Sequence, residues 1–114
     1  MNPKFNLWIE KNGQVVLSLW RVKLLEAIHQ TGSISAGAEA IGVPYRIAWQ
    51  KIREMEERLG EKLVETQTGG REGGGTALTA RALEYIEKFN QFNWESQDYL
   101  EDLYQKTFGD FKAS

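Results

Sequence analysis

The sequence of residues 32–66 is GSISAGAEAIGVPYRIAWQKIREMEERLGEKLVET, and residues 68–79 continue as TGGREGGGTALT. Ser35 offers a hydroxyl N-cap for a short helix over Ala36–Ile41. A glycine-proline turn follows, and the helical spacing of apolar residues then predicts a longer helix over Tyr45–Leu59 that ends at the next glycine. The segment therefore predicts two helices joined by a tight turn.

Two strand-like runs, Lys62–Thr66 and Thr76–Leu78, flank a glycine-rich loop over 69–75. Two helices followed by two strands are the layout of a winged helix-turn-helix, in which the longer helix enters the DNA major groove. The loop lacks the Gly-Lys-Ser/Thr ending of a nucleotide-binding loop. A wing that lies against a sugar-phosphate backbone explains the glycines better.

The chain before this segment predicts a hairpin and a helix. Alternating apolar residues over Phe5–Glu10, the dipeptide at 12–13 (Asn-Gly) and the run Val15–Leu17 indicate an N-terminal β-hairpin with a type I′ turn. Apolar residues at helical spacing then predict a helix over Leu19–Thr31, which Gly32 ends as a C-terminal cap.

A long helix is predicted over 80–108, with Thr79 as its cap. At 1.5 Å per residue it is about 40 Å long, so a small domain leaves part of its apolar stripe uncovered. The same stripe on a second copy is the simplest cover, which predicts a homodimer. Polar residues close to this apolar stripe leave open whether the helix is unbroken or kinked. The apolar stripe consists of Tyr85, Phe89, Phe92, Ser96, Tyr99 and Leu103, widened by Ile86, Leu100 and Tyr104.

The predicted fold is therefore mainly α with a small β component (α+β). Residues 1–79 are expected to form a winged helix-turn-helix DNA-binding domain that includes the N-terminal hairpin. Residues 80–114 are expected to form the dimerisation helix.

The helix over 45–59 has two different faces. Its expected core stripe consists of Ala48, Ile52, Met55 and Leu59. A second face, roughly a third of a turn away, combines aromatic rings with long hydrogen-bonding side chains, concentrated toward the half of a recognition helix that reaches base edges. The two arginines can pair with guanine or with phosphate, and the tryptophan can either contact DNA or pack against the domain. The outward residues are Tyr45, Arg46, Trp49, Gln50 and Arg53.

Several motifs together resemble a known family. They are LLEAI at 24–28, GSISAGA at 32–38, PYRIAWQ at 44–50 with IREME at 52–56, LVET at 63–66, and the GGREGGG loop followed by LT at 78–79. Over about residues 5–90 the chain resembles the DNA-binding domain of ModE-type molybdenum-responsive regulators and, more distantly, that of LysR-type regulators.

The resemblance implies a dimeric transcription regulator with two winged domains joined through long helices. It implies that Ser33 and Ser35 approach backbone phosphates and that the outward residues of the longer helix face the major groove. It also implies that Arg71 lies on the wing, near the backbone or the minor groove.

The chain departs from the family pattern at three places. Pro44 stands where relatives usually have Ser or Thr, so one hydroxyl contact is lost, and Trp20 and Ala82 stand where many have glycine. The sequence ends at Ser114, whereas ModE proteins continue into molybdate-binding domains. We therefore expect a ModE-like head without a molybdate-binding domain.

Composition narrows the class of protein. The net charge is −2, but residues 1–81 carry eleven lysines and arginines against nine acids, so the acidity lies in the C-terminal segment. Without cysteine, a signal peptide or a long apolar run, a cytoplasmic protein without membrane association is expected.

No cofactor, metal site or enzymatic activity is expected, because the single histidine, His29, has no converging partners. The leading hypothesis is a regulator that binds double-stranded DNA at an inverted repeat. The alternative is a winged-helix protein-interaction module without DNA binding. The sequence identifies no small-molecule effector.

Overall fold

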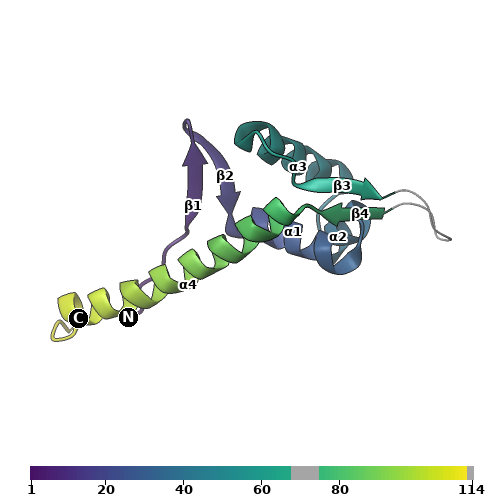
Figure 1. Ribbon diagram of the computed structural model, residues 1–114. Coiled ribbons are helices and arrows are strands. Elements are labelled where there is room, and N and C mark those ends of the chain that lie inside the picture. Colours follow the sequence, from purple (N-terminus) through teal and green to yellow (C-terminus); the bar gives the residue numbers. More distant parts are fainter. Residues whose placement is uncertain (68–74, 113–114) are drawn as a thin grey trace.

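The computed structural model describes residues 1–67 and 75–112 and is mainly helical, with two small β-hairpins (Figure 1). The predicted winged helix-turn-helix is confirmed, and three helices begin and end at the predicted residues. In chain order the elements are β1 (Trp8–Lys11), β2 (Gln14–Ser18), α1 (Leu19–Thr31), α2 (Ile34–Ala40), α3 (Tyr45–Leu59), β3 (Val64–Gln67), β4 (Gly75–Leu78) and α4 (Ala80–Phe108).

The N-terminal hairpin turns through Asn12 and Gly13, whose φ angles are 54° and 79°. Two successive residues with positive φ define the type I′ turn that the Asn-Gly pair favours. The pairing of β1 with β2 shifts after Ile9, which faces Leu17, and leaves Val16 as an extra residue in β2. Because this bulge interrupts the alternation of the strand, both Val16 and Leu17 are buried.

Helix α2 begins earlier than the sequence indicated. Its N-cap is Ser33, whose Oγ accepts a hydrogen bond from the backbone N–H of Ala36 at 2.9 Å. The predicted capping role of Ser35 is therefore wrong, and Ser35 lies exposed in the first turn of the helix. The cause is the left-handed conformation of Gly32 (φ 82°), which ends α1. The next residue, Ser33, is extended and can therefore cap α2 at once.

The core forms around α1. Its buried residues Leu24, Leu25 and Ile28 contact the inner faces of α2 and α3 and the stem of the second hairpin. Helices α1 and α2 approach closely at Gly37, where an added Cβ would lie 2.9 Å from the backbone nitrogen of Ile28. Further buried members of this cluster are Ala38, Ala48, Ile52, Met55, Leu63, Leu78 and Ala82.

Helix α4 is unbroken over its 29 residues. Thr79 caps it, as predicted, by accepting from the backbone N–H of Ala82. Its buried residues, Ala82 and Phe89, both lie in its first half, and the second half extends away from the other helices (Figure 1). The molecule is consequently elongated, with extents of 63 × 29 × 22 Å.

The second hairpin pairs β3 with β4, and Val64 faces Leu78. Strand β3 begins two residues later than predicted. The predicted glycine-rich loop and Arg71 lie outside the described residues.

Candidate nucleic-acid interface

The exposed side of α3 carries the predicted contact residues. Tyr45 and Trp49 keep 54% and 43% of their surface exposed, which is unusual for large aromatic residues. Arg46, Gln50 and Arg53 are also exposed, whereas the predicted core stripe faces inward. Helix α3 therefore presents two rings and three long polar side chains on one accessible surface, four of them in its N-terminal half.

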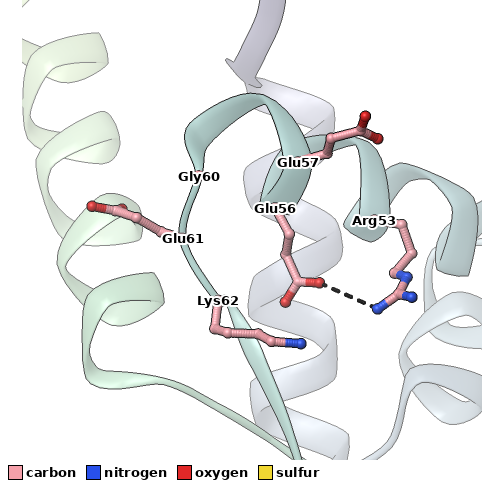
Figure 2. A pocket seen from close by; sticks show the side chains of 6 residues that line it. All are labelled: Arg53, Glu56, Glu57, Gly60, Glu61 and Lys62. Carbon is pink, nitrogen blue, oxygen red and sulfur yellow. Dashed lines mark ion pairs between the residues drawn. The ribbon is translucent and has the colours of Figure 1, made fainter.

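Trp49 and Arg53 form a pair on this surface. The Cζ atom of Arg53 lies 4.7 Å from the centroid of the Trp49 ring, a cation–π geometry. Its Nη1 atom lies 3.9 Å from Oε1 of Glu56 on the next turn of the helix (Figure 2). The guanidinium is thus oriented by a ring on one side and a carboxylate on the other, while more than half of its side chain stays accessible.

The turn that precedes α3 supplies few polar groups. Pro44 is the N-cap residue, with φ −61° and ψ 143°, and it has no side chain that could bond to the open N–H groups of the helix. The Oγ atom of Ser33 is occupied by the cap of α2. Ser35 keeps an exposed hydroxyl, so of the two serines it is the more accessible to a phosphate.

Glu56 connects α3 to the wing. Its Oε2 atom accepts hydrogen bonds from the backbone N–H groups of Leu63 at 2.9 Å and Val64 at 3.3 Å. Figure 2 shows this carboxylate between Arg53 and Lys62, with Glu57 directed away. Glu56 therefore holds the start of β3 and also lies beside Arg53. We call the exposed face of α3 formed by Tyr45, Arg46, Trp49, Gln50 and Arg53 the recognition surface.

A groove of about 500 Å³ separates α3 from the wing strands. Trp49 and Arg53 line one side, and Thr66 and Thr76 line the other. The backbone N–H of Thr76 donates to the carbonyl of Gly32 at 2.8 Å, which ties β4 to the end of α1. The wing stem therefore has a fixed position next to the recognition surface. The predicted contact of Arg71 belongs to the loop outside the described residues.

A charged cluster supports α3 from behind. Arg21 is only 8% exposed and lies near Glu54, whose Oε1 atom accepts from Arg58 Nη2 at 2.8 Å. Arg58 also donates through Nη1 to the carbonyl of Val15 at 2.9 Å, which joins α3 to the N-terminal hairpin.

The charges in this cluster change the ionisation of its members. Burial alone would raise the pKa of Glu54, but the nearby ammonium of Lys51 and the guanidiniums of Arg58 and Arg21 outweigh it and lower that pKa. Burial lowers the pKa of Arg21, and the charge of Glu54 opposes this effect. Glu54 therefore remains ionised at neutral pH, paired with Lys51 and Arg58 and influenced by the nearby charge of Arg21.

Sequence reasoning missed the roles of these acids. Charged residues on a helix are usually solvated, and Glu57 is exposed. Glu54 and Glu56 are instead partly buried, with 23% and 10% of their side-chain surface exposed. Their spacing from basic residues three and four positions away is the signal for the local ion pairs, but the backbone partners come from distant segments.

Two features are absent from residues 1–67 and 75–112. No helix there is long and apolar enough to cross a membrane. No group of three or more His, Cys, Asp or Glu side chains in those ranges is arranged to hold a metal ion.

Solved structures with the same arrangement support this fold. The crystal structure of the CbnR DNA-binding domain in complex with DNA matches with a TM-score of 0.59 at 22% identity, covering 76% of this chain and 98% of that one. Full-length CbnR in complex with its target DNA matches with a TM-score of 0.61 at 19% identity, covering 82% of this chain and 31% of that one.

Sequence relatives are closer. The molybdenum transport protein ModE of Azotobacter vinelandii is 37% identical over 101 residues, which are 85% of this chain and 37% of that protein. The transcriptional regulator ModE of Yersinia pestis is 39% identical over 92 residues, 81% of this chain and 32% of that protein. The chain thus spans about a third of the length of the curated relatives it matches.

The helix-turn-helix itself identifies the family. The region from the start of α1 to the first turn of α4 matches the family model of bacterial regulatory helix-turn-helix proteins over residues 19–83. These residues are more than half of the sequence and include α3 and both wing strands. The chain therefore belongs to the LysR family of bacterial regulatory helix-turn-helix proteins.

Proposed function

We propose that this chain is the DNA-binding part of a homodimeric transcription regulator that recognises an inverted-repeat operator. The proposal depends above all on the exposed face of α3, where Tyr45, Arg46, Trp49, Gln50 and Arg53 share one surface. A recognition helix contacts base edges with its N-terminal residues, and arginine and glutamine are side chains that pair bidentately with guanine and adenine. The family membership assigns the same regulatory class.

In this proposal the serines and the wing contact the backbone. Ser35 supplies a hydroxyl to a phosphate near the start of α2, and Ser33 fixes the helix that carries it. Arg71 on the wing contacts the flanking backbone or minor groove. Phosphate contacts of this kind fix the position of the protein on the duplex, whereas base contacts provide the sequence preference.

The dimer in this proposal forms through α4. Phe92, Tyr99 and Leu103 are exposed large side chains on one side of the helix, and Tyr99 is 69% exposed. Phe5, Ser96 and Leu100 line a groove of about 740 Å³ along the same helix, which Glu95, Asp98 and Asp102 also line. Two-fold pairing of this face covers both copies at once. The two α3 helices then enter major grooves about 34–36 Å apart, or a multiple of that distance.

We assign the two parts of the chain accordingly. Residues 1–79 form the DNA-binding winged domain, and residues 80–114 form the dimerisation helix. The molybdenum transport protein ModE of Azotobacter vinelandii is more than twice as long as this chain, so the connection to molybdenum describes that longer protein.

Fluorescence anisotropy with labelled duplex DNA over a salt series tests the proposal. Pools of random duplexes first yield the sequence that the protein selects, and binding to it is then compared with binding to a scrambled duplex. We expect preference for the selected duplex and affinity that falls steeply as salt rises, because bound lysines and arginines release counterions.

A flat signal at low salt with both duplexes would overturn the DNA-binding proposal. That outcome would favour the winged-helix protein-interaction module, with the exposed rings of Tyr45 and Trp49 as its contact surface.

A further inference from the structure

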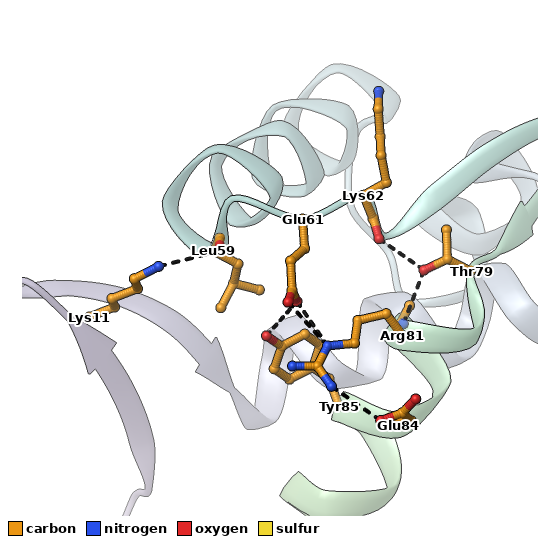
Figure 3. A network of polar contacts seen from close by, with 9 residues as sticks. Lys11, Leu59, Glu61, Lys62, Thr79, Arg81, Glu84 and Tyr85 are labelled. Atoms are coloured by element: carbon orange, nitrogen blue, oxygen red, sulfur yellow. Dashed lines mark hydrogen bonds and ion pairs between the residues drawn. The ribbon is translucent and has the colours of Figure 1, made fainter.

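A polar network joins the segment after α3 to the first turns of α4 (Figure 3). Glu61 follows the left-handed cap residue Gly60, and its carboxylate points toward α4. Its Oε2 atom accepts from the hydroxyl of Tyr85 at 2.6 Å, and both of its oxygens lie 3.1 Å from Nε of Arg81. Arg81 and Tyr85 are four residues apart on one face of α4, so a single carboxylate can bind both.

Backbone contacts restrict the same junction between the segment after α3 and the start of α4, which we call the joint. Thr79 donates its hydroxyl to the carbonyl of Lys62 at 2.9 Å and its backbone N–H to the carbonyl of Leu63 at 3.0 Å. On the hairpin side, Lys11 Nζ donates to the carbonyl of Leu59 at 3.3 Å. The segment between α3 and β3 is thus attached to α4 and to the N-terminal hairpin.

Contacts with charged groups are the stronger members of this network. The hydroxyl of Tyr85 and the guanidinium of Arg81 both donate to an ionised acceptor, which shortens and strengthens such bonds. Accepting from Tyr85 and Arg81 lowers the pKa of Glu61, so the acceptor is charged at neutral pH. The Cζ atom of Arg81 also lies 5.1 Å from the centroid of the Tyr85 ring.

The length of α4 makes this joint consequential. At 1.5 Å per residue its 29 residues extend about 43 Å, so a 10° change in its direction moves its far end by about 7 Å. That displacement is about two base-pair steps of 3.4 Å. The direction of α4 relative to α3 therefore determines where the two recognition helices of a dimer lie.

We propose that Glu61 is a positioning residue that locks α4 at one angle to the recognition helix, and thereby sets the half-site spacing of the operator. The proposal rests on the DNA-binding dimer proposed above. It adds a residue outside the recognition surface that determines which arrangement of half-sites is bound.

The first experiment measures the joint itself and needs no DNA. The chain contains no cysteine, so two introduced cysteines label cleanly. Spin labels at Glu57→Cys on α3 and Lys106→Cys near the end of α4 report the intramolecular distance by pulsed electron spin resonance, with unlabelled protein in excess to isolate single chains. We expect Glu61→Ala to broaden the distance distribution relative to the wild-type background.

A matched control separates the joint from a general loss of charge pairing. Glu84 binds the same arginine within α4, at 3.2 Å from Arg81 Nη1, without crossing the joint. Glu84→Ala should keep the wild-type distribution, and Tyr85→Phe should broaden it less than Glu61→Ala because the arginine contacts remain. Equal distance distributions for Glu61→Ala and wild type, with thermal melts showing that both are folded, would contradict the proposal that Glu61 fixes the angle of α4.

The second experiment measures spacing selectivity. The selected inverted repeat is compared with versions whose spacer is longer by two base pairs, which turns one half-site by about 70° relative to the other. We expect the ratio of affinities for the original and lengthened spacers to fall toward one in Glu61→Ala, while affinity for a single half-site is unchanged. Glu84→Ala should keep the wild-type ratio.

The outcomes distinguish the two proposals. Absence of DNA binding by the wild type overturns the proposed function, while the distance measurement still decides whether Glu61 locks the joint. An unchanged spacer ratio in a Glu61→Ala protein that binds the selected duplex overturns the role of Glu61 in selectivity.

Discussion

At the scale of single residues, the two arginines of the recognition surface have different surroundings. Arg53 is oriented by the Trp49 ring and by Glu56, whereas Arg46 is exposed near the start of α3. An arginine that is held in place loses less side-chain entropy when it binds, which favours a specific contact with a base. Arg46 is the better candidate for a mobile phosphate contact.

We therefore predict different effects for the two truncations. Arg46→Ala should weaken binding to all duplexes and make the log–log salt slope shallower by about 0.9 for one lost phosphate contact. Arg53→Ala should reduce the preference for the selected duplex by about 1–3 kcal/mol. Anisotropy titrations measure both, with Lys106→Ala as a control far from α3. Identical losses on selected and scrambled duplexes would contradict the role of Arg53.

The two serines at the start of α2 provide a second residue-scale prediction. Ser33→Ala should lower the free energy of unfolding by about 1 kcal/mol, because the N-cap bond to Ala36 is lost. Ser35→Ala removes an exposed hydroxyl and should leave stability nearly unchanged while weakening DNA binding slightly. Urea denaturation followed by tryptophan fluorescence distinguishes the two. A larger loss of stability for Ser35→Ala would contradict the cap assignment.

These serines also show what sequence reasoning achieves for individual residues. Both are good cap residues, two positions apart, and only the conformation of Gly32 decides which one is used. The outward positions of α3 were predictable because helical periodicity assigns a face to each residue. The contacts of Glu56 with Leu63 and Val64 depend on how the chain turns after α3, which periodicity does not describe.

At the scale of elements, the close approach of α1 and α2 predicts the effect of a methyl group. Alanine normally stabilises a helix relative to glycine by about 0.5–1 kcal/mol. At Gly37, however, the added Cβ would lie 2.9 Å from backbone and side-chain atoms of Ile28, so one helix has to shift. We expect Gly37→Ala to destabilise the fold by about 1–2 kcal/mol, at the lower end of overpacking costs. A variant more stable than wild type in urea denaturation would show that the two helices separate easily.

The charged cluster behind α3 predicts a pH dependence. The folded pKa of Glu54 is lowered from its ordinary value of 4.5, so its contribution to stability is present above that pH and is lost as the pH falls through the folded pKa. Glu54→Gln should cost about 1–3 kcal/mol at pH 7, because buried Arg21 loses its charged partner.

The difference between wild type and Glu54→Gln should therefore shrink as the pH decreases below 4.5. Denaturation at a series of pH values measures this difference. Glu57→Gln, at an exposed position of the same helix, is the matched control. A constant difference over the whole pH range would contradict the assignment of the charge to Glu54.

Element boundaries were predictable where the chain carries strong local signals. Glycines with positive φ end α1 and α3, and the hydroxyl of Thr79 begins α4, so local chemistry determines those positions. The start of β3 was less predictable, because Lys62 and Leu63 use their carbonyls to hold Thr79 instead of pairing in the hairpin.

At the scale of the whole molecule, the proposed dimer depends on the second half of α4. Phe92→Glu or Tyr99→Glu should produce monomers, because an ionised side chain in the paired apolar face loses its water. Sedimentation velocity measures the change, and the operator affinity should fall in parallel. Gln105→Glu places the same charge on an exposed position far around the helix from Phe92 and Tyr99 and should remain dimeric. Dimers that persist in both apolar-face variants would exclude this interface.

The arrangement of distant segments was the part that sequence patterns did not predict. The contacts of Arg58 with Val15 and of Glu61 with Tyr85 join positions 43 and 24 residues apart. The order of helices and strands predicted the fold because each element has its own periodicity and stop signals. The angle of α4 follows from side-chain contacts between different elements. Such contacts leave no periodic pattern in the sequence.

The places where the chain begins and ends have a practical consequence for handling the protein. Pro3, Lys4 and Phe5 lie beside Gln97, Leu100 and Glu101, so the first residues run along the second half of α4, and the last described residues follow that same helix (Figure 1). An affinity tag, a fluorescent reporter or a surface anchor fused to either end would consequently be attached far from α3. Immobilised protein should present its recognition surface outward whichever end is tethered.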